Sequence, residues 1–312
     1  MSKIVNLTNY QLVFTTSFEH KHGVSGHLYE MIDYYFITST NGIKSAILLS
    51  DGTTIDMFEK AIKDKYDFNP KEVDDILANT IECSYPKIIR ANNLCIVDGF
   101  GGFRNGIVYA DNLFLFRCSR SDFAVFSGHK TIKRTFLMQD FKMYKDRFEY
   151  LDIEVVDYVK KILWQRYKQP SVDKTNTAML YLTTNCRALP VKDVQRTMNK
   201  HPYENYLIVT DRPEVYQSLQ QDNVRIEQAP VKDVLSMFDT YIYTSTPLKS
   251  DCSPRFIVEC AVFGKEIIYE IDYFDPGIQA RKDAIESGVE QLMLTESDYF
   301  VQLVKSLCQP LL

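Results

Sequence analysis

From residue 178 onward, short apolar runs rich in β-branched and aromatic residues alternate with stretches of helical spacing. The apolar runs, in chain order, are AMLYLT, YLIVT, VRIEQ, TYIYTS and EIIYEI. Strands that are separated by helices of about 8 to 12 residues are typical of a parallel sheet with helices on both faces. Each crossover between such strands is expected to be right-handed. The sequence therefore predicts a Rossmann-like α/β domain in this part of the chain.

The first half of the chain shows a similar but less regular pattern. QLVFTT is predicted to be a strand, and the amphipathic stretch VSGHLYEMIDYYFITST is predicted to be a helix that ends before the strand SAILLS. Further on, NLCIVDGF and NLFLFRCS have the composition of buried strands. No GxGxxG motif opens a helix, so the dinucleotide-binding fingerprint is absent.

At 312 residues the chain exceeds the size at which one hydrophobic core stops growing, which favours two domains. Residues 150–169 have helical apolar spacing and precede Pro170 and a polar, turn-prone segment. We therefore expect an N-terminal domain over 1–169 and a C-terminal domain over 170–312. The final amphipathic segment, SDYFVQLVKSLCQPLL, is predicted to be a helix that can cross back onto the first domain. The predicted fold class is α/β with two Rossmann-like domains.

The composition limits the classes of function. A net charge of −5 and a pI near 5.6 argue against a protein that coats nucleic acid electrostatically. Seven cysteines without a CxxC pair fit reduced thiols better than a disulfide framework. The chain has neither a signal-peptide pattern at its start nor about 18 consecutive uncharged apolar residues. These features predict a soluble protein of the cytoplasm.

The segment SPRFIVECAVFGKEIIY contains a well-marked predicted helix. Ser253 suits the N-cap, and Pro254 suits the first helical position, where its missing N–H group costs nothing. Gly264 suits the left-handed residue that ends a helix. We therefore expect a helix over about 254–263, preceded by the strand TYIYTS and followed by the strand EIIYEI.

Two charged residues lie in the first turns of this predicted helix. Arg255, together with the exposed N–H groups of the helix end, would attract a diphosphate. Glu259 could accept hydrogen bonds from ribose hydroxyls. The alternative is that Arg255 and Glu259 form only a surface pair at i,i+4 spacing, in the weaker orientation with the basic residue first.

Two Rossmann-like domains, the missing dinucleotide fingerprint and this helix together resemble glycosyltransferases of the GT-B architecture, in which the two domains face a cleft. The resemblance implies that Glu259 contacts the ribose of a UDP-sugar donor. It also implies that the loop after the first strand of the second domain contacts the donor phosphates. The residues that it assigns to donor binding are Thr184, Arg187, Ala229, Val231, Ser253, Pro254, Arg255 and Glu259.

Within that architecture, the short length and the Asn-, Tyr- and Lys-rich texture most resemble bacteriophage transferases that glycosylate 5-hydroxymethylcytosine in DNA, including glucosyl- and arabinosyltransferases. The spacing from Arg255 to Glu259 is four residues, whereas the phage glucosyltransferase pattern has three. The resemblance implies a double-stranded DNA acceptor and, for a phage-encoded protein, action in the cytoplasm of the infected bacterium. Carbohydrate or lipid acceptors remain the alternative within GT-B, and a non-catalytic nucleotide- or partner-binding protein is the alternative of another class.

Inverting glycosyl transfer requires a carboxylate or histidine as general base on the acceptor side. Candidate bases at the ends of predicted strands are Asp98, Glu19, His22 and Asp122. Asp98 and Glu19 rank first, because a carboxylate just beyond a buried strand is held rigidly, although Asp98 before Gly99 is also a common turn pair. For His20, His22 and His27, loop or capping roles are favoured over a metal site, since no third ligand has an evident spacing. No DxD pair is present, so a divalent cation is compatible with the sequence but not required by it.

Residues 128–147 are the most basic part of the chain that also carries aromatic rings. Phe136, Phe141 and Tyr144 are interleaved with the cations, as expected of a surface that binds nucleic acid. The predicted DNA-binding residues are Lys130, Lys133, Arg134 and Lys142. The alternative is a solvated amphipathic helix with its approach loop. A second basic run, which includes Lys160 and Lys161, is predicted to form the polar face of the helix over 150–169.

Overall fold

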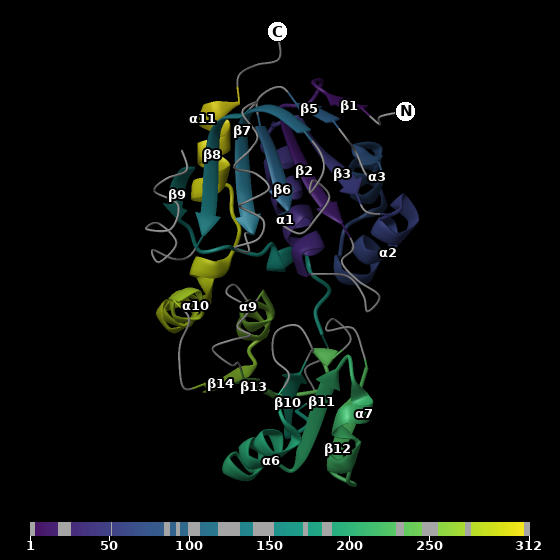
Figure 1. The fold of residues 1–312 in the computed structure, drawn as a ribbon, viewed down its shortest axis with the longest axis vertical. Helices are drawn as coiled ribbons and strands as arrows, with labels where there is room; N and C mark the ends of the chain where they lie inside the picture. Colours follow the sequence, from purple (N-terminus) through teal and green to yellow (C-terminus); the bar gives the residue numbers. More distant parts are fainter. Residues whose placement is uncertain are drawn as a thin grey trace. The chain divides into compact units, whose positions relative to one another are not determined.

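The computed structural model divides the chain into two compact units (Figure 1). Unit 1 contains residues 1–167 and 293–312, and unit 2 contains residues 168–292. Each unit has its own parallel sheet. The structure describes residues 4–17, 26–50, 52–83, 88–91, 94–98, 107–117, 132–139, 153–170, 174–182, 189–228, 234–244, 255–271 and 276–308.

The sheet of unit 1 is parallel in every described strand pair. Its main path runs in the order β1-β5-β7-β6-β2-β3-β4, and β8 joins β7 to the edge strand β9. The strands are β1 (Ile4–Leu7), β2 (Leu12–Ser17), β3 (Ser45–Ser50), β4 (Thr80–Glu82), β5 (Ile88–Ala91), β6 (Leu94–Asp98), β7 (Ile107–Arg117), β8 (Ile132–Gln139) and β9 (Ile153–Asp157).

The strand order of unit 1 reverses between β2 and β6. Successive strands extend from β2 through β3 to β4 on one side, and from β6 through β7 and β8 to β9 on the other. Ligands of open α/β sheets bind beyond the carboxyl ends of the strands at such a switch point. The edge formed by the carboxyl ends of β2 and β6 is therefore where a site of unit 1 is expected.

The described α-helices of unit 1 are α1 (Gly26–Thr40), α2 (Ile55–Lys65), α3 (Pro70–Ala78) and α11 (Tyr299–Leu307). Helix α1 is buried at most positions from His27 to Thr38, and its buried side chains include the polar His27, Glu30 and Asp33 as well as apolar ones. The side chain of Thr54 caps α2, and Asn69 with Glu72 forms a capping box on α3. These caps explain why α2 begins at Ile55 and α3 begins at Pro70.

The C-terminal helix α11 belongs to unit 1, which confirms the predicted crossing back to the first domain. Phe300 at its start packs edge-on against Phe114, Phe116 and Tyr34. Asp298 caps α11 by accepting a hydrogen bond from the Phe300 N–H group at 2.9 Å. Its apolar face and its N-cap therefore hold α11 against the sheet of β7 and β8 (Figure 1).

The helix predicted over 150–169 is wrong, and the helix that was the alternative interpretation of the stretch 128–147 is not found in its described residues. Residues 153–157 form strand β9, residues 158–163 contain no helix, and Trp164–Arg166 makes a single 3-10 turn, so 150–169 is not a helix. In the basic stretch 128–147, the described residues 132–139 form strand β8, not an amphipathic helix. Both stretches contain β-branched residues, and pairing of β8 with β7 and of β9 with β8 favours the extended form.

Unit 2 has the five-stranded sheet that the alternating pattern predicts, in the order β12-β11-β10-β13-β14 and parallel throughout. Its strands are β10 (Thr177–Leu182), β11 (Asn205–Thr210), β12 (Val224–Glu227), β13 (Thr240–Thr244) and β14 (Glu266–Glu270). Its described helices are α6 (Val191–Lys200), α7 (Pro213–Tyr216), α9 (Arg255–Val262) and α10 (Pro276–Ser287), with 3-10 turns at Gln217–Leu219 and Val289–Leu292. The predicted α/β class with two Rossmann-like domains is confirmed.

The sheet of unit 2 buries an apolar cluster on each face. Tyr241 and Tyr243 of β13 pack with Phe256 and Ile257 of α9. Leu182 of β10 belongs to the other cluster, which includes residues of α6 and α7. The alternation of side chains along each strand separates the two faces. The switch point of this sheet lies between β10 and β13.

Candidate functional site

Helix α9 lies at the carboxyl edge of unit 2, because it follows β13 and leads into β14. Its bounds, Arg255–Val262, confirm the helix predicted at about 254–263. Gly264 has φ +69°, the left-handed conformation expected at the helix end. The N–H group of Gly264 donates to the carbonyl of Ala261 at 3.0 Å, and that of Lys265 donates to Cys260 at 2.9 Å. Ser253 and Pro254 lie outside the described residues.

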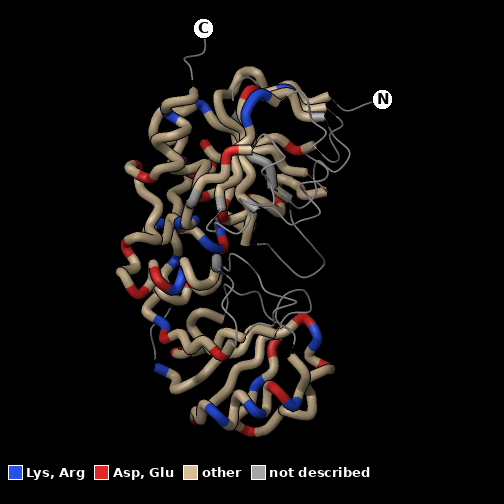
Figure 2. The backbone as a smooth tube through the Cα atoms, turned by 60° about the vertical axis from the view of Figure 1, so that its left-hand side comes forward, with Lys and Arg blue, Asp and Glu red and all other residues tan. Residues whose placement is uncertain are grey.

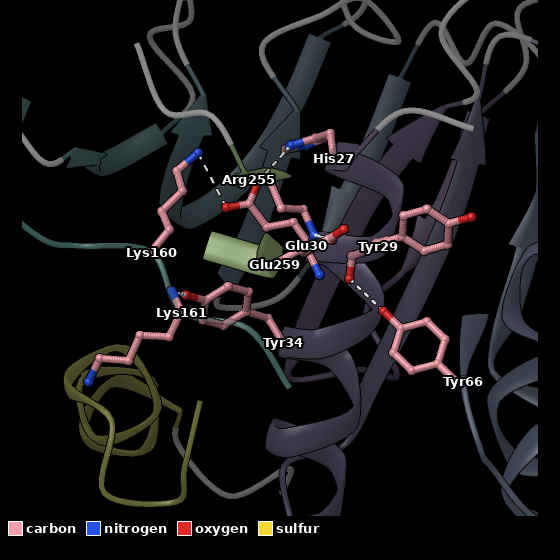
Figure 3. Close-up of polar contacts among 9 residues, drawn as sticks. All are labelled: His27, Tyr29, Glu30, Tyr34, Tyr66, Lys160, Lys161, Arg255 and Glu259. Carbon is pink, nitrogen blue, oxygen red and sulfur yellow. Dashed lines mark hydrogen bonds and ion pairs between the residues drawn. The ribbon is translucent and has the colours of Figure 1, made fainter. Parts of the chain in front are cut away.

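Arg255 and Glu259 form an ion pair along α9, with Arg255 Nε donating to Glu259 Oε1 at 2.9 Å. The pair is present as the alternative interpretation requires, but it is not on the surface. The side chains of Arg255 and Glu259 are only 14% and 3% exposed. Figure 3 shows the two side chains side by side. Burial of an ion pair carries a desolvation cost, and a cation in the first turn of a helix is opposed by the helix dipole. An anion bound at the helix end would offset both costs.

A buried hydroxyl lies at the end of the strand that precedes α9. Thr244, the last residue of β13, is 2% exposed, and its Oγ1 has no hydrogen-bond partner. The pairing of Ala178 with Thr240 leads, four residues further along both strands, to Leu182 and Thr244. Thr244 therefore lies on the switch-point edge between β13 and β10, where Rossmann-like sheets hold their ligands.

In unit 1 the corresponding edge lies at the carboxyl ends of β2 and β6. Thr16, near the end of β2, is 1% exposed, and its Oγ1 has no hydrogen-bond partner. Asp98, a predicted base, is the last residue of β6. Its backbone lies two residues beyond the Phe14–Ile96 pair of β2 and β6, and the register against β7 shifts at this point. The backbone of Asp98 thus reaches the predicted ligand edge.

A buried cluster of ionisable side chains lies on the same side of the unit 1 sheet (Figure 3). His27 Nδ1 lies 3.0 Å from Glu30 Oε2 within the first turns of α1, and Lys160 Nζ lies 3.3 Å from Glu30 Oε1. The three side chains are 2%, 9% and 8% exposed. Helix α1 follows β2, and Lys160 follows β9, so both elements bring the cluster to the carboxyl side of the sheet.

This cluster was missed by the sequence interpretation. Lys160 was predicted on the solvated face of a helix, whereas it is buried in a segment without helix, and His27 was assigned a loop or capping role. Glu30 and Lys160 are far apart in sequence, so no spacing relates them. The one local signal was His27 with Glu30 at i,i+3 on a predicted helix. Chemically, an imidazole that is held by a carboxylate is the arrangement of a general base and its orienting group.

The predicted DNA-binding residues Lys133 and Arg134 lie at the start of β8, at the amino end of the strand. Each is exposed and paired with an acid. Lys133 Nζ lies 2.8 Å from Asp111 Oδ1, and Arg134 donates to Glu154 at 3.0 Å. Basic and acidic residues are interspersed along the described parts of both units (Figure 2). The positive charges of Lys133 and Arg134 are therefore paired with neighbouring carboxylates. Both residues lie at the opposite end of β8 from the carboxyl edge of the sheet.

Most of the other predicted site residues lie outside the described residues. These are Glu19, His22, Asp122, Thr184, Arg187, Ala229, Val231, Lys130 and Lys142. Among the described residues, no group of three His, Cys, Asp or Glu side chains is arranged to hold a metal ion. The described helices also include none with the length and apolar character of a membrane span.

No protein-family model matches the sequence, and no curated protein sequence matches it. Among solved structures, one similar chain is described as "Trehalose-6-phosphate from E. coli bound with UDP-2-fluoro glucose". The TM-score is 0.40 with 10% sequence identity, and the match covers 95% of this chain and 95% of that chain. A likeness of this size says nothing of what the present chain binds.

Proposed function

We propose that this protein transfers a sugar from a UDP-sugar to the hydroxymethyl group of 5-hydroxymethylcytosine in DNA. The observation that carries the donor half of the proposal is the buried Arg255–Glu259 pair in the first turns of α9. It lies at the carboxyl edge of a Rossmann-like sheet, beside the switch point. The resemblance of the α9 segment to the donor helix of GT-B enzymes supports the choice of a nucleotide sugar.

The donor half of the reaction requires neutralisation of the departing diphosphate. In this proposal Arg255 and the N–H groups at the start of α9 contact the phosphate oxygens, and Arg187 contacts them from the loop after β10. Glu259 holds the guanidinium of Arg255 and accepts hydrogen bonds from the donor ribose. Arg255 is opposed by the helix dipole until the anion binds, so donor binding relieves an existing electrostatic cost.

The acceptor half requires removal of one proton. As the hydroxymethyl oxygen attacks the anomeric carbon, a base takes its proton, the bond from that carbon to the diphosphate oxygen breaks, and UDP leaves with the electron pair. We propose Asp98 as this base because its backbone ends β6 at the switch point of unit 1. Glu19, His22 and Asp122 remain proposals from the sequence, and His27 with Glu30 is a further candidate at the same edge.

The proposed function is tested by incubating hydroxymethylated DNA with a panel of UDP-sugars and analysing the released nucleosides by mass spectrometry. A glycosylated hydroxymethylcytosine is expected with one sugar, and DNA with ordinary cytosine is the control. Absence of any product with every sugar would contradict catalysis and favour a non-catalytic nucleotide-binding protein. Product on a carbohydrate or lipid acceptor, and none on DNA, would retain glycosyl transfer and reject the DNA acceptor.

The donor site is tested by calorimetry of UDP binding to Arg255 variants. Loss of a charge-assisted contact of about 1.5–3 kcal/mol predicts roughly 10- to 150-fold weaker binding for Arg255→Ala. Arg255→Lys keeps a positive charge beside the buried Glu259, so it is the variant to measure if Arg255→Ala does not fold. The matched control is Arg196→Ala, since Arg196 is 78% exposed and pairs with Asp193 on α6. Equal UDP affinity in native and Arg255→Ala protein would exclude this donor site.

The DNA surface is tested by reversing the charge of Lys133 and Arg134 together. If both contact phosphates, transfer to DNA falls and its salt dependence becomes shallower. Lys60→Glu with Lys63→Glu is the matched control, because these α2 lysines are also exposed and paired with acids. If the two double variants behave alike, DNA does not bind at the start of β8.

A further inference from the structure

Unit 2 contains a pocket that the proposed function does not use. It has a volume of 240 Å³ and lies where β10 and β11 end, between the starts of α6 and α7. Leu182 and Thr210, the last residues of the two strands, are register partners at its base. The described residues that line it are Leu182, Leu189, Pro190, Thr210, Asp211, Arg212, Val215 and Tyr216.

The pocket is separate from the donor helix. Leu182 and Tyr216 belong to the apolar cluster on the α6 face of the sheet, whereas Phe256 and Ile257 of α9 belong to the cluster on the opposite face. Alternation along β10 places Met179 with α9 and Leu182 with α6. A ligand in this pocket would therefore contact α6 and α7, and not the Arg255–Glu259 pair.

The walls of the pocket suit a ring. Leu182, Leu189 and Val215 are apolar, and the Tyr216 side chain is held in place by its hydroxyl, which donates to the carbonyl of Leu189 at 3.0 Å. An engineered apolar cavity of about 150 Å³ holds benzene, and pockets for drug-sized ligands begin near 300 Å³. A volume of 240 Å³ therefore takes one ring system and leaves the rest of the ligand at the mouth.

The polar residues of the pocket come directly after β11. The N–H group of Arg212 donates to Thr210 Oγ1 at 3.1 Å, which fixes the turn that contains Asp211. In strand–helix–strand units that bind nucleotides, an acidic residue after the second strand accepts hydrogen bonds from ribose hydroxyls. Asp211 has this position in the unit β10–α6–β11. The guanidinium of Arg212, which is exposed beside Glu214, can stack on a ring at the mouth.

We propose that this pocket is a second ligand site that binds a ribonucleoside, with the base between Leu182, Val215 and Tyr216 and the ribose hydroxyls on Asp211. The sequence between Leu182 and Leu189 contains no glycine, so it lacks the glycine-rich fingerprint of a dinucleotide fold. A nucleoside, and not a dinucleotide, is the ligand that fits. The site goes beyond the proposed transfer reaction and does not depend on it.

The test is calorimetry of the full-length protein with adenosine and uridine, each compared with its 2′-deoxy counterpart. At least one ribonucleoside is expected to bind saturably, and its 2′-deoxy form to bind about tenfold more weakly. Asp211→Asn should weaken the ribonucleoside by a similar factor and abolish the difference between the two forms, because both changes remove the same contact. Asp222→Asn is the matched control, since it removes an exposed carboxylate elsewhere in unit 2.

Occlusion of the pocket gives an independent reading. Val215→Phe fills the space between α7 and Leu182 and should reduce binding at least tenfold; the Asp211→Asn comparison decides the proposal if Val215→Phe does not fold. Arg255→Ala should leave nucleoside binding unchanged, whatever it does to UDP. The proposal is overturned if neither ribonucleoside binds, if the 2′-deoxy form binds equally well, if Asp211→Asn has no effect or matches Asp222→Asn, or if Arg255→Ala abolishes the binding.

Discussion

Removal of one hydroxyl from Tyr158 should loosen the C-terminal helix from unit 1. Tyr158 is the middle of a buried hydrogen-bond chain. The N–H group of Lys161 donates to the Tyr34 oxygen at 3.1 Å, the two tyrosine oxygens lie 2.5 Å apart, and the Tyr158 hydroxyl donates to Asp298 at 2.9 Å. Asp298 is the N-cap of α11. The chain thus joins α1, the segment after β9 and α11.

The size of the effect follows from the bonds that are lost. Tyr158→Phe keeps the ring but removes a hydrogen bond to a carboxylate, worth about 1.5–3 kcal/mol, and one between hydroxyls, worth about 1 kcal/mol. The free energy of unfolding should therefore fall by about 2.5–4 kcal/mol. At roughly 2–4 °C per kcal/mol, Tm should fall by about 5–15 °C. Thermal unfolding followed by circular dichroism measures this fall, with Tyr109→Phe, an exposed ring, as the control.

The buried tyrosine pair should also make the stability of the protein depend on pH in the alkaline range. Burial raises the pKa of both Tyr34 and Tyr158 well above 10.0, and the negative charge of Asp298 raises both further. The folded state therefore keeps protons that the unfolded state releases above pH of about 10. Stability is fully present below that pH and falls as pH rises toward the folded pKa, by about 1.4 kcal/mol per pH unit for each group.

Tyr158→Phe removes one of these groups, so its stability should fall less steeply with pH above 10 than that of the native protein. Urea unfolding at several pH values between about 9 and 11 measures the two slopes. A loss of less than about 1 kcal/mol at neutral pH, together with equal alkaline slopes, would refute the hydrogen-bond chain as the anchor of α11.

Three further changes test other parts of the fold. Gly264→Ala should cost about 1–2 kcal/mol in urea unfolding, because φ is +69° while the space for a methyl group is open; a neutral result would contradict the left-handed helix end. Burial raises the pKa of Asp239, but hydrogen bonds from Thr175 and Thr177 outweigh this effect, so the net pKa is lowered. The free energy of unfolding should therefore fall as pH drops below about 4, and Asp239→Asn should make this fall less steep. Burial raises the pKa of Cys308 to about 11, so iodoacetamide at neutral pH should label Cys308 more than tenfold faster in urea than in the folded protein; equal rates would contradict its burial.

Unit 2 was largely predictable because its signals are local. Strands of the TYIYT type bury both faces in a parallel sheet, so they are continuous apolar runs, and the helices between them have clear ends. Gly264 is an example, since its conformation follows from the helix that it terminates. The ion pair of Arg255 and Glu259 was likewise implied by i,i+4 spacing, but its burial was not, because burial depends on what packs over α9.

Unit 1 was harder to predict, because the spacing of its apolar residues fits both a helix and a strand. The stretch that includes IEVVD fits helical spacing, yet β8 offers a strand edge, and pairing with it makes β9. Because residues 158–163 form no helix, Lys160 is buried against Glu30 instead of lying on a solvated helix face. One error in the secondary structure therefore concealed the ionisable cluster of His27, Glu30 and Lys160.

The sequence by itself determined the α/β class, the parallel sheet of unit 2 and the helix that carries Arg255 and Glu259, because hydrophobic period and helix-end residues act over a few positions. Only the tertiary structure determined that Asp211 lines the same pocket as Leu182 and Tyr216, and that Glu30 forms an ion pair with Lys160. Those contacts join residues that are far apart in the chain. They arise only when strand order brings separate carboxyl ends to one edge of a sheet.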